Sequence, residues 1–233
     1  MRKEARKPRV RKQIRTTSMQ LMQCEPLTDN QTLMFESTKH VVAHGSAGTG
    51  KTFVATYLAL EAILRKQQYG HLVYIRSAVP TRNMGFLPGT DKEKAEVYEQ
   101  PYKEIAQDLF GDVNAYDKLK SDGTVRFMTT SFIRGSTLRD CIVIVDECQN
   151  MSMHELDSII TRIGENCRIF FCGDMFQNGD LGKETSGLGE FYDILKRMNE
   201  FDFIDFKIED VVRGPLVKSY LTARWKNNES RPQ

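Results

Sequence analysis

The chain has 233 residues, 40% of them hydrophobic and 27% charged, which is the composition of an ordinary globular domain. Its length suits one large α/β domain with a full hydrophobic core. The longest apolar run, "CIVIV" at 141–145, is far shorter than the roughly 20 residues of a membrane span, so we expect no membrane partner. The five cysteines are odd in number and lack Cys-x-x-Cys spacing. They predict reduced thiols in a cytoplasm, either that of a bacterium or that of a host cell if the protein is viral.

Positive charge is concentrated at the start of the chain. Residues 1–15 hold eight Lys or Arg and one Glu, a net charge of +7, whereas the remainder carries 25 bases and 30 acids, a net charge of −5. Basic arms of this kind are usually disordered and often contact nucleic acid. We therefore expect a disordered basic arm at 1–20, followed by a single domain at 21–233. A tail that only aids solubility is the alternative.

Apolar segments alternate with helical patterns along the rest of the chain. A helix is predicted in 27–39, with its start at Thr28 or Asp29, and another in 91–110, interrupted by Pro101. Further helices are predicted at 52–64, 152–163 and 186–199. Strands are predicted at 40–44, 71–77, 125–130, 141–146, 168–174 and 201–206. Several strands are almost entirely apolar, as in a parallel sheet buried on both faces, so the alternation predicts an α/β fold with a doubly wound, mostly parallel sheet.

The octet "GSAGTGKT" at 45–52 matches the pattern G-x-x-x-x-G-K-[ST] and lies between a predicted strand and a predicted helix. Glycines let backbone N–H groups curl around phosphate oxygens, and the helix N-terminus adds a partial positive charge. We expect Lys51 to reach the β- and γ-phosphates and Thr52 to offer its hydroxyl to Mg²⁺. The other residues predicted to form the phosphate cradle are Gly45, Ser46, Ala47, Gly48, Thr49 and Gly50.

Two adjacent acids follow the strand "CIVIV". Ligands bind at the carboxyl ends of the strands in a doubly wound sheet, where Asp146 and Glu147 are expected to lie. Asp146 is predicted to hold Mg²⁺, directly or through water. Glu147 is placed to take a proton from a water that attacks the γ-phosphate. The pair therefore indicates that the nucleotide is cleaved and not only bound.

Three further polar residues are site candidates. Gln177, after the strand in "FFCGDMFQ", is predicted to bond the γ-phosphate or the attacking water, although it also suits a polar turn. Arg213, in "DVVRGPL", is predicted to stabilise the negative charge of the transition state, although a lone arginine here also suits the surface. Gln31, in "TDNQ", is a candidate for the edge of adenine, because a side-chain amide offers one donor group and one acceptor.

Together these segments resemble the PhoH family of P-loop ATPases, related to superfamily 1 helicases, over about 25–222. The sequence departs from the usual family pattern at Ser46, where the family has Pro, and at Cys148, where it has Ala. The match is loosest after "GFLPG". The resemblance rests on "GSAGTGKT", "IVDECQN", "CGDMFQ", "DVVRGPLV", "YIRSAVP", "GFLPGTDKEK", "FIRGSTLRD" and "TRIG".

The resemblance implies a RecA-like ATPase core, with ATP and Mg²⁺ as ligands and an ATP-driven or helicase activity on RNA or single-stranded DNA. It implies catalytic roles for Lys51, Glu147, Gln177 and Arg213. Three arginines in family motifs of less certain role are candidates for contacts with nucleic acid, namely Arg76, Arg134 and Arg162.

A lone P-loop domain of roughly 200 residues leaves its nucleotide half exposed. We therefore expect a ring, six-fold by preference, in which Arg213 reaches the nucleotide of the next subunit. A protein that binds nucleic acid under the control of ATP, without translocation, is one alternative. A small-molecule kinase is another, but it would not need Glu147 poised on a water.

Overall fold

The computed structural model describes residues 19–77, 91–133, 135–174 and 187–229, without the side chains of 91–95 and 227–229. Six strands form one sheet in the order β3-β2-β4-β5-β1-β6, and every neighbouring pair is parallel. The strands are β1 (His40–Gly45), β2 (His71–Arg76), β3 (Val125–Thr129), β4 (Cys141–Val145), β5 (Cys167–Gly173) and β6 (Phe201–Phe206). The predicted RecA-like α/β fold with a doubly wound, parallel sheet is confirmed.

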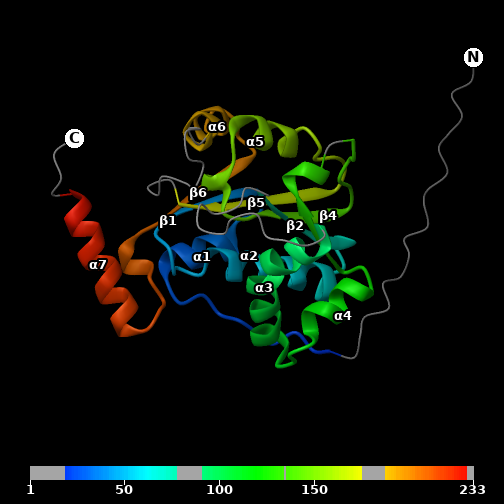
Figure 1. The fold of residues 1–233 in the computed structure, drawn as a ribbon, viewed down its shortest axis with the longest axis horizontal. Coiled ribbons are helices and arrows are strands. Elements are labelled where there is room, and N and C mark those ends of the chain that lie inside the picture. The colour runs from blue at the N-terminus through cyan, green and yellow to red at the C-terminus, as the bar shows by residue number, and fades with distance from the viewer. Residues whose placement is uncertain (1–18, 78–90, 134, 175–186, 230–233) are drawn as a thin grey trace, which may run out of the picture.

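Helices cover both faces of the sheet (Figure 1). On one face lie α1 (Asp29–Glu36), α2 (Lys51–Leu60), α3 (Asp91–Phe110) and α4 (Ala115–Ser121), and a π-helical turn, Glu61–Arg65, extends α2. On the other face lie α5 (Met153–Ile160) and α6 (Leu188–Leu195). The last helix, α7 (Pro215–Glu229), stands apart at the β6 edge, where it contacts the 3-10 turn Ile208–Asp210. None of the described helices has the length and apolar character needed to cross a membrane.

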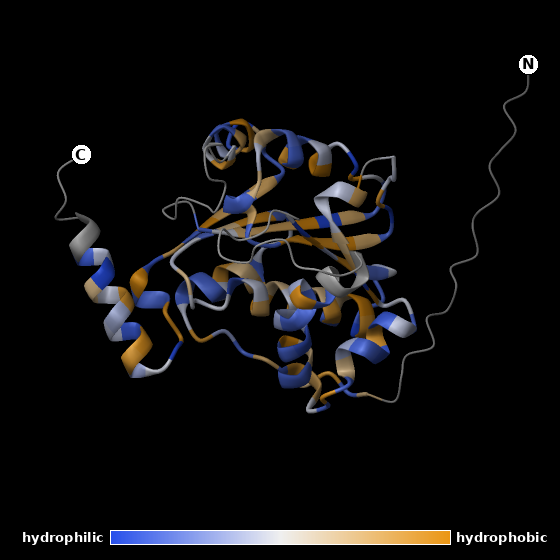
Figure 2. Cartoon of the chain, viewed as in Figure 1, coloured by the Kyte–Doolittle hydropathy of each residue, from blue (hydrophilic) through white to orange (hydrophobic). Residues whose placement is uncertain are grey.

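Two hydrophobic layers explain the apolar strands. Successive side chains of a strand point to opposite faces of a sheet. In β4, Ile142 and Ile144 accordingly pack toward α2, whereas Val143 and Val145 pack toward α5 and α6, and all are buried. Hydropathy colouring shows the same arrangement, with apolar strands between helices that carry polar residues outward (Figure 2). The sheet is thus a rigid platform for the loops at its carboxyl edge.

The helices begin close to the predicted positions. Thr28 caps α1 by accepting a hydrogen bond from the N–H of Gln31, and Ser152 caps α5 in a reciprocal capping box with Glu155. The predicted interruption at Pro101 is wrong, because α3 runs through it from Asp91 to Phe110. Pro101 is exposed, so the lost backbone hydrogen bond faces water. The buried residues that follow, including Tyr102, keep the helix in line against the core.

Candidate active site

The loop after β1 has the backbone of a phosphate cradle. Gly45, Gly48 and Gly50 have φ values of 115°, 75° and 81°, a region that favours glycine. At Gly45 a side chain would also collide with the carbonyl oxygen of Phe206 on the neighbouring strand. The octet "GSAGTGKT" therefore has glycine at each of the three positions where the backbone favours it, although the pattern fixes only Gly45 and Gly50.

Contacts on the outer side of the loop orient its peptide groups. The carbonyl of Gly48 accepts a 3.1 Å hydrogen bond from the N–H of Val212, and the carbonyl of Thr49 accepts one of 2.9 Å from Nε2 of Gln31. The C=O and N–H groups of a trans peptide point in opposite directions. The N–H groups of Thr49 and Gly50 consequently point away from Val212 and Gln31. Such N–H groups are what a cradle offers to phosphate oxygens.

Gln31 of α1 contacts the backbone of the cradle loop. Its side chain is buried, and Oε1 accepts a 2.8 Å hydrogen bond from the N–H of Leu27 while Nε2 donates to Thr49. The structure thus shows a supporting role that the sequence pattern did not suggest. The contact of Gln31 with adenine stays a prediction.

Lys51 lies across the cradle. Its Nζ donates to the carbonyl oxygens of Gly45 at 2.9 Å and Ser46 at 2.7 Å, and to Oγ1 of Thr49 at 3.3 Å. Burial lowers the pKa of this ammonium group, because charge is costly away from water. Negatively charged phosphate oxygens compensate a buried ammonium better than neutral carbonyls do. The contact of Lys51 with the β- and γ-phosphates stays a prediction.

Asp146 meets the first turn of α2. Thr52 Oγ1 donates a 2.7 Å hydrogen bond to Oδ1 of Asp146, although 94 positions separate the two residues in the sequence. Tyr102 of α3 donates a 2.9 Å hydrogen bond to the other carboxylate oxygen, Oδ2. Mg²⁺ prefers hard oxygen ligands and usually takes one or two carboxylates together with substrate phosphates. Thr52 and Asp146 fit such a site.

Glu147 has a left-handed backbone, with φ 52°, at the turn that follows β4. Its Oε2 accepts a 2.5 Å hydrogen bond from Nε2 of Gln149, and Oε1 of Gln149 accepts one of 3.1 Å from the N–H of Asp174. Burial and, secondly, the charge of Asp146 raise the pKa of Glu147, while the positive charge of Arg76 opposes the rise. A carboxylate with a raised pKa is a stronger base, as proton abstraction from water requires.

Arg213 lies beside the cradle of its own chain. A Cβ placed on Gly48 would be 2.9 Å from Cγ of Arg213, and the preceding residue, Val212, bonds the Gly48 carbonyl. The arginine is exposed. This position next to a phosphate cradle agrees with a role on phosphate. The cradle that Arg213 approaches is, however, that of its own chain and not that of a neighbouring subunit.

The nucleic-acid candidates lie in different surroundings. Arg76 ends β2, with its guanidinium 5.7 Å from the ring centre of Tyr98 on α3. Arg162 follows α5, and its buried Nε has no hydrogen-bond partner among the described residues. Arg134 and Gln177 lie outside the described residues, as do residues 1–18 of the predicted arm. Their roles stay predictions.

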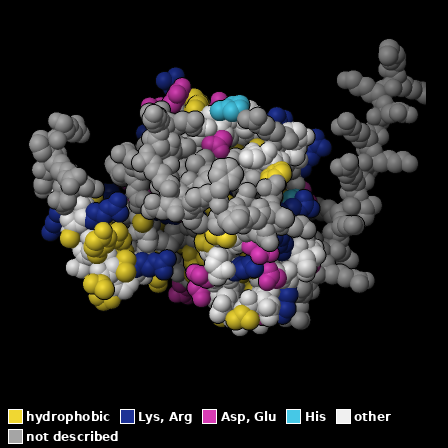
Figure 3. All heavy atoms as spheres, viewed as in Figure 1, with side chains coloured by type: hydrophobic (Ala, Val, Ile, Leu, Met, Phe, Trp, Pro, Cys, Tyr) yellow, Lys and Arg dark blue, Asp and Glu magenta, His cyan; other side chains and the backbone are white. Residues whose placement is uncertain are grey.

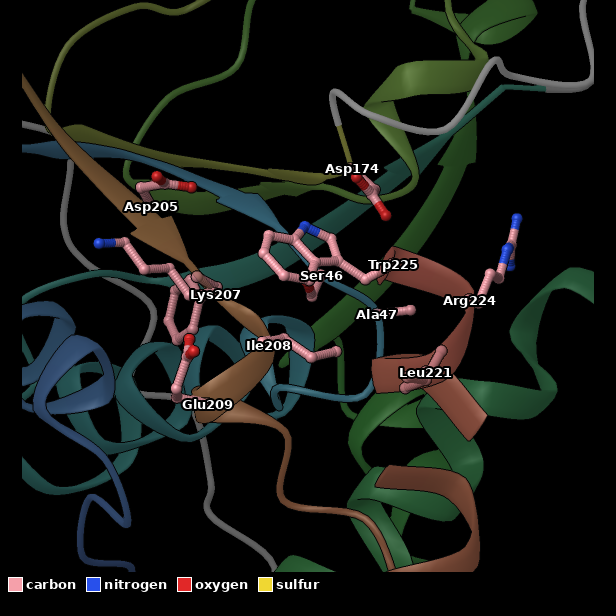
Figure 4. Close-up of a pocket in the computed structure, with 11 residues that line it drawn as sticks. Ser46, Ala47, Asp174, Asp205, Lys207, Ile208, Glu209, Leu221, Arg224 and Trp225 are labelled. Atoms are coloured by element: carbon pink, nitrogen blue, oxygen red, sulfur yellow. The ribbon is translucent and has the colours of Figure 1, made fainter. Parts of the chain in front are cut away.

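A cavity of about 450 Å³ adjoins the cradle. Ser46 and Ala47 line one side of it, Asp174 and the segment 205–209 line others, and Leu221, Arg224 and Trp225 of α7 complete it. The indole of Trp225 is directed from α7 toward Ser46, whereas Arg224 points outward (Figure 4). Tyr102, Gln149 and Trp225 also belong to the site, although no sequence motif predicts their contacts. For Gln149 the signal was its place two residues after Glu147, with Cys148 between them.

The outer face of α7 is apolar and basic. Leu216 is 84% exposed and Tyr220 64% exposed. Exposed apolar side chains that form a contiguous patch often mark an interaction surface. In the space-filling view, apolar and basic side chains gather on this helix at the left of the molecule (Figure 3).

A glycine cradle between strand and helix, with a threonine held to an acid at the end of a parallel strand, is how P-loop NTPases build their phosphate site. The fold and the site thus define a P-loop NTPase. The family model "PhoH-like protein" matches residues 23–224, and the chain belongs to that family.

Curated relatives agree with this assignment. The chain is 33% identical to a PhoH-like protein of Mycobacterium leprae over 180 residues, which are 77% of this chain and 51% of that protein. It is 34% identical to a PhoH-like protein of Bacillus subtilis over 186 residues, 79% and 57% of the two chains. It is 31% identical to Protein PhoH of Escherichia coli K12 over 192 residues, 81% and 53% of the two chains. The chain spans about half the length of these relatives.

Among solved structures, the large terminase of a thermophilic bacteriophage aligns with 84% of this chain and 50% of its own, at a TM-score of 0.49 and 12% identity.

Proposed function

We propose that the chain hydrolyses ATP with the help of Mg²⁺. The observation that carries this proposal is the 2.7 Å hydrogen bond between Thr52 and Asp146, with Glu147 as the next residue. It joins the phosphate cradle to the carboxylate of Asp146. The adjacent carboxylate of Glu147 is one that a protein which only binds nucleotide does not need.

Each residue has one task in the proposed reaction. Lys51 and the cradle N–H groups bind the phosphates, and Thr52 and Asp146 hold Mg²⁺, which supplies positive charge against the phosphate oxygens. Glu147 orients a water molecule and accepts its proton. Arg213 stabilises the negative charge that develops on the transferred phosphoryl group, a contribution that reaches about 10³–10⁵ in rate in other P-loop enzymes.

We further propose that hydrolysis is coupled to binding or remodelling of RNA or single-stranded DNA. The net charge of +7 in residues 1–15 supports an electrostatic contact with phosphates. Arg76 supports the coupling, because it is a nucleic-acid candidate whose charge also acts on Glu147. A cytoplasmic location is part of this proposal.

We also propose a homo-oligomer, a six-fold ring by preference, in which the exposed apolar side chains of α7 pack against a neighbouring subunit. Their exposure supports an interface. The proximity of Arg213 to Gly48 supports an action of Arg213 within its own chain. This differs from the role on a neighbouring subunit that the sequence predicts.

Steady-state ATPase rates with and without RNA or single-stranded DNA test the function. We expect ATP hydrolysis that rises with a nucleic acid, and a chain without residues 1–15 should bind it more weakly and with a flatter salt dependence. Hydrolysis that nucleic acid leaves unchanged, while ATP alters nucleic-acid binding, would favour the regulated binding protein. Phosphate transfer to a small acceptor, without release to water, would favour the kinase.

A further inference from the structure

Tyr102 is a buried side chain on the metal side of the site that no sequence motif covers. Its hydroxyl donates to Oδ2 of Asp146 at 2.9 Å, while Thr52 donates to Oδ1 at 2.7 Å. The two oxygens of the carboxylate are thus held by hydroxyl groups from two different helices, α3 and α2. A carboxylate bonded at both oxygens has a fixed plane, whereas one bonded at a single oxygen can rotate.

The ring of Tyr102 is itself fixed by a closed set of contacts. It stacks on Tyr74 of β2 with ring centres 4.0 Å apart and an angle of 17° between the planes. The hydroxyl of Tyr74 pairs at 2.9 Å with that of Thr56 on α2. Thr56 lies one turn after Thr52 and therefore on the same face of the helix. These contacts therefore link Tyr102 to α2 in two ways, through Asp146 and Thr52 and through Tyr74 and Thr56.

We propose that Tyr102 is a positioning residue that fixes the Asp146 carboxylate for Mg²⁺ bound with ATP. This inference rests on the proposed function. Groups that orient a metal ligand typically contribute about 10–100-fold to metal affinity or activity when removed. Tyr102 also lies one helical turn after Tyr98, which carries the guanidinium of Arg76 over its ring. The helix α3 therefore contacts both the metal-holding acid and a nucleic-acid candidate.

The test is Tyr102→Phe, which removes only the hydroxyl and keeps the stacked ring. We expect the Mg²⁺ concentration that half-saturates the metal-dependent binding of ATP to rise about tenfold or more. ATP binding without metal should stay as in the wild type. Direct binding of Mn²⁺ in the presence of ATP, followed by its electron paramagnetic resonance signal, gives a second readout that needs no turnover. Tyr116→Phe, which truncates a buried tyrosine of α4 in the same hydrophobic layer, is the matched control.

A purely structural role predicts a different pattern. In that case Tyr102→Leu would lower the melting temperature, but Tyr102→Phe would bind Mg²⁺ and Mn²⁺ like the wild type. This combination of results would overturn the inference. If the wild type itself shows no metal-dependent binding of ATP, the proposed function fails instead. A rise in the required Mg²⁺ for Tyr102→Phe, with a melting temperature near that of the Tyr116→Phe control, supports the positioning role.

Discussion

The amide of Gln149 donates a 2.5 Å hydrogen bond to the carboxylate of Glu147. Oε1 of the same side chain accepts a hydrogen bond from the N–H of Asp174, the residue that follows β5. Gln149 is only 5% exposed. Gln149 therefore links the proposed base on one strand end to the start of the segment that carries Gln177.

Truncating this link should slow hydrolysis. In Gln149→Ala the Glu147 carboxylate loses its side-chain partner and can rotate, and a misplacement of about 1 Å costs up to about 100-fold in rate. We expect kcat to fall by up to about 100-fold. The affinity for ATP and Mg²⁺ should change little, because the substitution leaves the cradle residues unchanged. Stopped-flow nucleotide binding and steady-state rates together measure the two effects. Wild-type turnover in this variant would show that Gln149 has no part in positioning the base.

The pH profile should report the environment of Glu147. Burial and Asp146 raise the pKa of Glu147, and a base acts only when deprotonated, so activity should disappear on acidification at a higher pH than the ordinary glutamate pKa of about 4.3 implies. Arg76 lowers this pKa, so Arg76→Gln should move the acidic limb of kcat/KM to higher pH. A shift of that limb to lower pH would contradict the assignment.

Trp225 offers an intrinsic signal for nucleotide binding. It is the single tryptophan of the chain and shares a cavity with Ser46 and Ala47 of the cradle. Titration with ATP and Mg²⁺ should therefore change its fluorescence in a saturable way, and Lys51→Ala should shift the change to higher ATP concentrations. Binding detected by calorimetry without any change in emission would show that the cavity is remote from the nucleotide.

Mixing two inactive variants tests where Arg213 acts. Arg213→Ala keeps the cradle and lacks the arginine, and Lys51→Ala keeps the arginine and lacks the cradle lysine. If Arg213 acts within its own chain, as its proximity to Gly48 supports, no subunit of a mixed ring has both residues and activity stays absent. Subunit exchange must be established first with two differently tagged wild-type samples. Activity that reappears on mixing would assign Arg213 to the neighbouring nucleotide.

The sequence predicted most of the fold because several strands are short, almost entirely apolar runs that alternate with helical patterns. The meeting of Thr52 with Asp146 was also predictable, since the carboxyl ends of parallel strands share one edge of a sheet. Tyr102 was not, because its contact depends on α3 continuing through Pro101. Trp225 is likewise brought to the cradle by the placement of α7, which no local pattern specifies.

The central claim is that Glu147 is the base of a metal-dependent ATPase, and Glu147→Gln tests it most directly. The amide keeps the size of the side chain but does not accept the proton, and general bases contribute about 10²–10⁴ in rate. We predict ATP and Mg²⁺ binding close to that of the wild type and a turnover at least about 100-fold lower, with Glu190→Gln on α6 as the matched control. Hydrolysis by Glu147→Gln at the wild-type rate would contradict the account.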